Sequence, residues 1–251
     1  MSSGTRSKAS GESTAPIPRV HAVDTARGVA LVGMIVFHVA RDLEMFGVLA
    51  AGTTLFGPWA VFARLVAGSF LFLAGVGLVL GHCDGVRWRA FGRRLAVIAG
   101  AAIVVSASTY LVAPSVFIYF GVLHAIAASS LLALAFLGAP AWVPAASGAA
   151  VLLAHGAVPP IFATPWLGWT GLSAQVRPSL DFLPLIPWLG PCLLGVAAGR
   201  IFPWHALSGV GPTSRLDAML GWMGRRSLAI YLLHQPILLS GLWLLLVFPA
   251  R

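Results

Sequence analysis

The segment RVHAVDTARGVALVGMIVFHVARDLE, residues 19–44, decides how the rest of the chain folds, because it carries ionisable side chains inside an apolar run of membrane length. Four of them lie at offsets 0, 3, 14 and 17, which at about 100° per residue places them within a sector of about 100° on one helix face: Asp24, Arg27, His38 and Arg41. A charge at bilayer depth costs at least about 2.5 kcal/mol, so this face should line a bundle interior or a watered cavity. The simpler interpretation is that Asp24 and Arg27 pair near the interface and His38 hydrogen-bonds a neighbouring helix.

The composition indicates an all-α integral membrane protein, a polytopic bundle of about seven transmembrane helices. Of 251 residues, 59% are hydrophobic and 9% are charged, with a mean hydropathy of +0.91, whereas a typical soluble domain is about 25% charged. No ten-residue alternation typical of an outer-membrane barrel occurs. Residues 1–18, rich in Ser, Gly and Pro, are expected to form a disordered cytoplasmic tail before one transmembrane domain, 19–251.

Apolar runs predict seven spans, and the basic residues predict their orientation. The spans are placed at about 24–46, 56–81, 92–113, 115–138, 140–158, 182–202 and 227–248. No cleavable signal peptide is expected, because the first run is long and charged. A cytoplasmic N-terminus puts eleven basic residues inside against three outside (Arg41, Arg177 and Arg251): Arg6, Lys8, Arg19, Arg87, Arg89, Arg93, Arg94, Arg200, Arg215, Arg225 and Arg226. We therefore expect a bacterial inner (cytoplasmic) membrane protein.

The net charge of +9 is explained by this topology and by lipid contact, and no nucleic-acid motif is present. Cys83 and Cys192 lack metal-like or redox spacing, so no metal site is expected. A homo-oligomer is possible, and the sequence does not determine the oligomeric state. Residues 214–223 predict a short interfacial helix with Leu216, Met219 and Trp222 on one side. Three tryptophans around the longest outer loop fit an interfacial belt or a surface for stacking a sugar ring: Trp166, Trp169 and Trp188.

Three histidines lie at membrane depth: His38, His124 and His234. A histidine can take up and return a proton near neutral pH, as a general acid or base must, and His38 is the leading candidate. A lone histidine in a membrane helix is more often a hydrogen-bonding partner in helix packing, and this interpretation stays open for each of the three. Gln235 and Pro236 follow His234, and this proline frees backbone carbonyls one turn earlier, which suits a cavity wall.

Charged side chains outside the first span suggest two further places for a ligand. Arg64, inside the second span, needs a carboxylate or a bound anion, and Asp42, Glu44 and Asp181 lie on that side. The cytoplasmic arginines could bind the phosphates of a nucleotide-bearing donor such as coenzyme A, although the positive-inside rule explains the same residues: Arg87, Arg89, Arg93, Arg94, Arg225 and Arg226.

Five stretches resemble the catalytic domain family of heparan-alpha-glucosaminide N-acetyltransferase, whose bacterial members are the DUF1624 transmembrane acyltransferases. In chain order they are VDTARGVALVGMIVFH, ARLVAGSFLFLAGVGL, IYFGVLHAIA, DFLPLIPWLG and GRRSLAIYLLHQP, spread over roughly residues 19–245. The chain departs from the lysosomal members in having no histidine near Leu49, where the resemblance places their key histidine.

The resemblance implies transfer of an acetyl or other acyl group from cytoplasmic acyl-CoA to an amine or hydroxyl of a sugar or glycan acceptor. The family's polar positions fall on Asp24, Arg27, His38, Asp42, His124, Asp181, His234 and Gln235. We expect catalytic roles for His38, Asp24, Arg27, His124 and His234. We expect donor binding by Arg93, Arg94 and Arg226, and acceptor binding by Asp42, Arg64, Asp181 and Gln235. The alternative is a proton-coupled transporter or channel that uses the same buried Asp, Arg and His.

Overall fold

The described residues fold into a bundle of helices. The structure is a computed structural model that describes residues 19–83, 85–156, 159–207 and 209–246, so the predicted tail, 1–18, lies outside the described residues. The helices are α1 (His21–Met45), α2 (Gly57–Leu80), α3 (Trp88–Val112), α4 (Val122–Ala133), α5 (Trp142–Ala154), α6 (Leu185–Ile201), α7 (Arg215–Arg225) and α8 (Ser227–Leu246). Three short 3-10 turns accompany them: η1 (Leu134–Phe136), η2 (Pro165–Thr170) and η3 (Trp204–Leu207).

Four helices are long and apolar enough to cross a membrane, which confirms an all-helical integral membrane protein. They are α1, α2, α3 and α8, and three shorter apolar helices accompany them: Val122–Phe136, Trp142–Ala154 and Leu185–Ile201. The predicted seven spans are therefore represented by four full-length candidates and three shorter helices, and the number seven stays a prediction. Within the described ranges the only β-type pairings are two isolated bridges, Phe120 with Phe182 and Phe162 with Ser173.

The predicted start of the fourth span, at residue 115, is wrong, because α4 begins at Val122. The preceding segment pairs with the connection before α6. The Leu180 N–H donates to the Val116 carbonyl at 2.8 Å, and the Leu183 N–H donates to the Phe120 carbonyl at 3.0 Å. Backbone groups that bond to another segment cannot also form the first turn of a helix. The apolar residues 115–121 therefore run alongside their partner segment instead of extending the helix.

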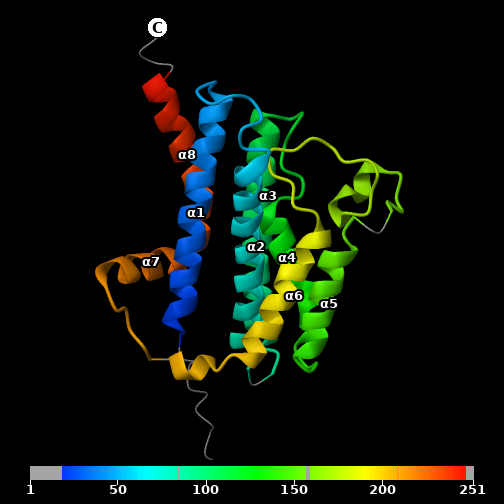
Figure 1. Cartoon of the computed structure of the whole chain (residues 1–251), viewed down its shortest axis with the longest axis vertical. Helices are drawn as coiled ribbons and strands as arrows, with labels where there is room; N and C mark the ends of the chain where they lie inside the picture. The colour runs from blue at the N-terminus through cyan, green and yellow to red at the C-terminus, as the bar shows by residue number, and fades with distance from the viewer. Residues whose placement is uncertain (1–18, 84, 157–158, 208, 247–251) are drawn as a thin grey trace, which may run out of the picture.

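Figure 1 shows α7 at the side of the bundle, almost at right angles to α1 and α8. Its sequence predicts this helix well, since Ser214 caps it by accepting the Asp217 N–H at 3.1 Å. Leu216, Met219 and Trp222 remain exposed, as an interfacial helix requires. The boundaries shift only from the predicted 214–223 to 215–225.

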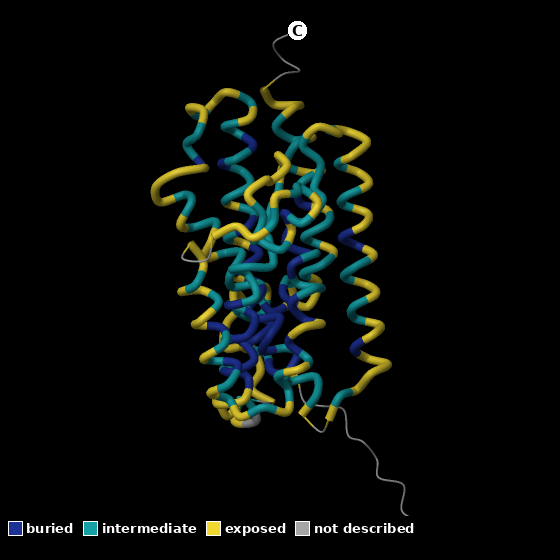
Figure 2. Tube along the Cα trace, turned by 90° about the vertical axis from the view of Figure 1, so that its right-hand side faces the viewer, coloured by how far each residue is buried: buried dark blue, intermediate teal, exposed yellow. Residues whose placement is uncertain are grey.

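Buried residues gather in the lower half of the bundle (Figure 2), where glycines allow close helix packing. A side chain at Gly75 on α2 would meet the Cys192 carbonyl of α6, and one at Gly195 on α6 would meet the Phe72 carbonyl of α2. Gly148 on α5 faces Gly190 on α6 in the same way, as the small residues of the predicted fifth span suggest. The tight α2–α6–α5 packing leaves α1, α3 and α8 to enclose a cavity with α2.

Candidate functional site

The lower end of the bundle contains a cavity of about 910 Å³ whose wall is strongly cationic. It lies between the beginning of α1, the end of α2 and the beginnings of α3 and α8. Asp24 is the only acidic residue of its described wall, whereas six arginines line it: Arg19, Arg27, Arg87, Arg93, Arg94 and Arg225. We call this the arginine cavity. Such an excess of positive charge in a low-dielectric wall attracts and holds an anion.

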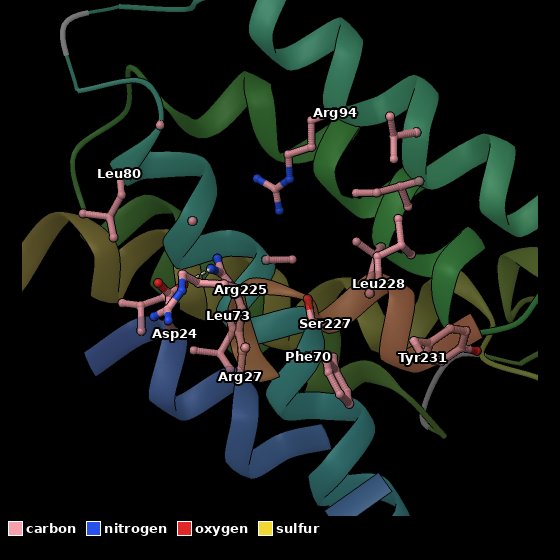
Figure 3. A pocket seen from close by; sticks show the side chains of 18 of the residues that line it. Asp24, Arg27, Phe70, Leu73, Leu80, Arg94, Arg225, Ser227, Leu228 and Tyr231 are labelled. Carbon is pink, nitrogen blue, oxygen red and sulfur yellow. Dashed lines mark hydrogen bonds and ion pairs between the residues drawn. The ribbon is translucent and has the colours of Figure 1, made fainter. Parts of the chain in front are cut away.

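Two of these arginines point toward one another across Gly77 of α2 (Figure 3). A Cβ on Gly77 would lie 2.6 Å from Arg27 Nη2, which would have to move, and 3.8 Å from Arg94 Nη1, an ordinary contact distance, so the absence of a side chain leaves the Arg27 guanidinium its present room. Arg27 donates to Asp24 Oδ1 at 3.2 Å. Arg94 forms no hydrogen bond or ion pair with any described residue. A half-buried, unpaired guanidinium beside another positive charge indicates a site for a bound anion.

A second polar group, the histidine cluster (His38, Asp42, His234 and Gln235), lies where α1 and α8 meet farther along the bundle. The rings of His38 and His234 are 4.8 Å apart between centroids. Gln235 Nε2 donates to Asp42 Oδ1 at 2.8 Å. Sequence reasoning named all four of these residues, and the structure brings them together from helices almost 200 residues apart in the chain.

Three buried atoms of the histidine cluster have no hydrogen-bond partner among the described protein groups: Asp42 Oδ2, His234 Nε2 and Gln235 Oε1. His234 Nδ1 lies 2.6 Å from the Tyr231 carbonyl, which can only accept, so Nδ1 carries a proton and donates it. The neutral ring therefore presents an unprotonated Nε2. Buried polar atoms normally find partners, so three unpartnered atoms in one cluster favour a place where polar substrate groups bind.

The arginine cavity and the histidine cluster are adjacent on α8. Tyr231 lines the cavity, and His234 belongs to the cluster only one helical turn later. On α1 the interval is longer, about 16 Å from Arg27 to His38 at 1.5 Å per residue. An extended ligand anchored by its anionic end in the cavity can therefore reach the cluster with its other end.

His124 and Asp181 do not join either group, because both hold the first turn of α4. His124 Nδ1 accepts the Gly121 N–H at 3.2 Å, so its proton is on Nε2, which faces Ser106 Oγ at 3.3 Å. Asp181 accepts the Val122 N–H at 3.0 Å. Burial raises the pKa of Asp181 to about 6, and the Val122 hydrogen bond opposes that rise. These contacts close an otherwise open helix N-terminus.

The remaining predicted arginines are spread over the surface. Arg64 is exposed on α2 and forms no ion pair or hydrogen bond with described residues, away from the carboxylates proposed as its partners. Arg93 lines the cavity from an exposed position. Arg226 lies outside the cavity wall, with its guanidinium 4.7 Å from the centre of the Trp222 ring. Its neighbour Arg225 is the one that lines the cavity.

Sequence reasoning missed the contact that brings Arg225 to the cavity, the packing of α7 on α1. Asp217 on α7 accepts from Thr25 Oγ1 at 2.7 Å and lies 3.0 Å from His21 Nε2. The hydrogen bonds that Asp217 accepts, first from the Thr213 N–H and then from Thr25, lower its pKa to about 2. Gly224 of α7 packs directly against the α1 backbone. The glycines of the α7 sequence were the one available signal of this close approach.

The comparison with protein families decides the identity of the chain. The family model of the heparan-alpha-glucosaminide N-acetyltransferase catalytic domain matches residues 19–236. The chain belongs to this family. The match covers both the arginine cavity and the histidine cluster, and it makes the chain a membrane enzyme of the acyltransferase type. No curated protein and no solved structure matches the chain.

The family assignment confirms the resemblance recognised in the five sequence stretches. It gives no support to the transporter alternative. No group of three or more His, Cys, Asp or Glu side chains suited to a metal ion occurs among residues 19–83, 85–156, 159–207 and 209–246.

Proposed function

We propose that this member of the heparan-alpha-glucosaminide N-acetyltransferase family transfers an acetyl or other acyl group from cytoplasmic acyl-CoA to an amine or hydroxyl of a sugar-like acceptor. One observation carries the proposal: a cationic cavity lies one helical turn along α8 from a polar cluster in which three buried atoms have no partner among the described groups. Acyl-CoA has the matching shape, with phosphates at one end and a thioester at the end of a long arm.

The arginine cavity is proposed to bind the phosphates of the donor. Arg94 has no partner among the described residues, and Arg27 donates to only one of them, from Nη1 to Asp24, so both guanidinium groups have N–H groups left for charge-assisted hydrogen bonds to phosphate. Arg93 and Arg225 add positive charge at exposed positions of the wall. Arg226, predicted from sequence to bind the donor, contributes only longer-range attraction from its place on Trp222.

The histidine cluster is proposed to carry out the transfer. His38 accepts the proton of the acceptor amine or hydroxyl as that nitrogen or oxygen attacks the thioester carbon. The tetrahedral intermediate then collapses, the carbon–sulfur bond breaks, and the proton passes to the departing thiolate of coenzyme A. His234 Nε2 and Gln235 Oε1 can both accept hydrogen bonds and have no partner among the described groups, so they hold the sugar-like substrate by its N–H or O–H groups. Asp42 positions Gln235 through their hydrogen bond.

The protein is proposed to lie in a bacterial inner membrane with its N-terminus in the cytoplasm. The six arginines of the cavity wall are then at the cytoplasmic end, where acyl-CoA is found. Exposed apolar side chains on α3, such as Ile103, Leu111 and Val112, would contact lipid. His124 and Asp181 are assigned no chemical step, because their contacts account for them as the start of α4.

The test is release of free coenzyme A by the purified protein in detergent, given acetyl-CoA with glucosamine and a panel of glycan acceptors. The proposal expects acceptor-dependent release that is abolished in His38→Ala. His155→Ala, which changes an exposed histidine at the end of α5, is the matched control and should retain full activity. Full activity in a folded His38→Ala variant would refute the role of His38.

Two other results would refute the function itself. A wild-type protein that fails to bind coenzyme A has no donor site. Proton-coupled uptake into proteoliposomes in the absence of acyl-CoA would instead identify a transporter.

An acyl group recovered on His38 after mixing with donor alone would establish a covalent intermediate in place of direct transfer.

A further inference from the structure

Tyr231 occupies the junction between the arginine cavity and the histidine cluster. It lines the cavity together with Phe70 and Leu228. Its ring is also 5.6 Å from the ring of His234, measured between centroids. In Figure 3 it lies at the opposite end of the cavity from Asp24 and Arg225. Tyr231 is thus the side chain that both compartments share.

The α1 side of this junction is closed by apolar packing. Leu31 and Met34 lie between Arg27 and His38 on the same face of α1, and their exposed fractions are only 0% and 4%. A group that passes from the cavity to His38 must therefore pass on the α8 side. On α8, Leu228 precedes Tyr231 by three residues and His234 follows it by three, so all three side chains lie along one stripe.

We infer that Tyr231 sets the length of the acyl chain that the enzyme accepts, with its ring filling the space that a longer chain would need next to the thioester. This inference rests on the proposed function. The thioester carbon must lie near His38 and His234 for transfer, while the phosphates remain among the arginines. The arm between phosphates and thioester passes the Tyr231 ring on its way to the cluster, so the acyl chain, which starts at the thioester carbon beside His234, competes with the arm and the ring for the same space. A methyl group fits there, whereas each further methylene group must displace the ring.

The aromatic ring carries this role, and the hydroxyl does not. The ring is what touches both the cavity and His234, and interiors packed at crystal-like density respond to changes of even one methylene group. Removal of the ring opens a space beside the thioester that additional methylene groups can fill. Because burial of each methylene group is favourable, two of them should raise kcat/KM by about tenfold in the enlarged site.

The experiment measures kcat/KM for acetyl-, butyryl- and hexanoyl-CoA with the purified full-length protein and one accepted acceptor. Wild type should prefer acetyl-CoA, and Tyr231→Ala should shift the ratio of butyryl to acetyl by about tenfold or more toward butyryl. Tyr231→Phe keeps the ring and should keep the wild-type profile. Tyr231→Trp enlarges the ring and should lower the butyryl rate further, which provides a second reading if the alanine variant does not fold.

Tyr110→Ala is the matched control, since Tyr110 is an exposed tyrosine that does not line the cavity and lies about 18 Å along α3 from Ile98, the last residue of that helix in the wall. Its profile should equal that of the wild type. An unchanged profile in folded Tyr231→Ala or Tyr231→Trp, with active wild type, would overturn the inference alone. A wild type that turns over no acyl-CoA would refute the proposed function, which separates the two failures.

Discussion

Replacing Arg94 with glutamine tests the donor site most directly, because Arg94 has no described protein partner to lose. Hydrogen bonds to charged groups contribute about 1.5–3 kcal/mol. At about 1.4 kcal/mol per factor of ten, Arg94→Gln should weaken coenzyme A binding by about 10- to 150-fold. Isothermal titration of coenzyme A into the purified protein in detergent measures this directly.

The same substitution should have the opposite effect on the protein without ligand. Arg94 and Arg27 approach the same face of Gly77, so their like charges repel each other. Arg94→Gln removes this repulsion and leaves no acidic partner unpaired, since the described wall holds only Asp24, which pairs with Arg27. The ligand-free Tm should therefore equal or exceed that of wild type, while the rise in Tm caused by coenzyme A should shrink.

Two neighbouring arginines on α3 provide graded controls. Arg93 lines the cavity but is exposed, so Arg93→Gln should cost about 0.2–1 kcal/mol, less than about fivefold in affinity. Arg89 is exposed and outside the wall, so Arg89→Gln should leave affinity unchanged apart from a small, salt-sensitive effect. Equal affinity of wild type and folded Arg94→Gln, or equal losses in all three variants, would refute a donor site built around Arg94.

Two further predictions concern the packing of α7 on α1. Gly224→Ala inserts a methyl group against the α1 backbone, so it should destabilise the protein by about 1–3 kcal/mol and weaken coenzyme A binding by displacing Arg225. The control is Gly100→Ala, in open space on α3, which should change neither stability nor affinity. Thermal unfolding measures the stability, and titration with coenzyme A measures the affinity. Asp217 has a pKa lowered to about 2 from 3.8, chiefly by the Thr213 N–H, so its contribution to stability is present above about pH 4 and is lost as the pH falls toward 2. The difference in Tm between wild type and Asp217→Asn should accordingly narrow over this range, and a constant difference would contradict the assigned hydrogen bonds.

Much of the fold follows from the sequence because membrane helices satisfy their own backbone groups. Hydropathy alone therefore predicts α1, α2, α3 and α8 within a few residues. It fails at α4, where an apolar segment pairs with the connection before α6 instead of coiling. Hydropathy reports how apolar a segment is, and it cannot report that a distant segment offers better partners for its backbone.

The residues of the candidate site can likewise be predicted from the sequence only in part. Helical periodicity places Asp24, Arg27 and His38 on one face, and the structure directs them to the arginine cavity and the histidine cluster. Arg41, the fourth member of the stripe, turns instead to Glu44 at 3.0 Å near the end of α1. The role of Tyr231 could not be predicted, because it depends on how α8 lies against α1. The sequence alone does not distinguish such a tyrosine from one that only packs against neighbouring helices.

The cytoplasmic arginines show how structure separates two explanations that are identical in sequence. A topology signal needs positive charge near the ends of spans and works best when that charge is exposed, as at Arg89 and Arg93. It gives no reason to hold a guanidinium half-buried and unpaired beside another one, which is costly in a membrane protein. Arg94 is held in this way, close to Arg27, for which Gly77 makes room. A bound anion would offset that cost, so ligand binding and stability should be linked at this residue and independent at Arg89.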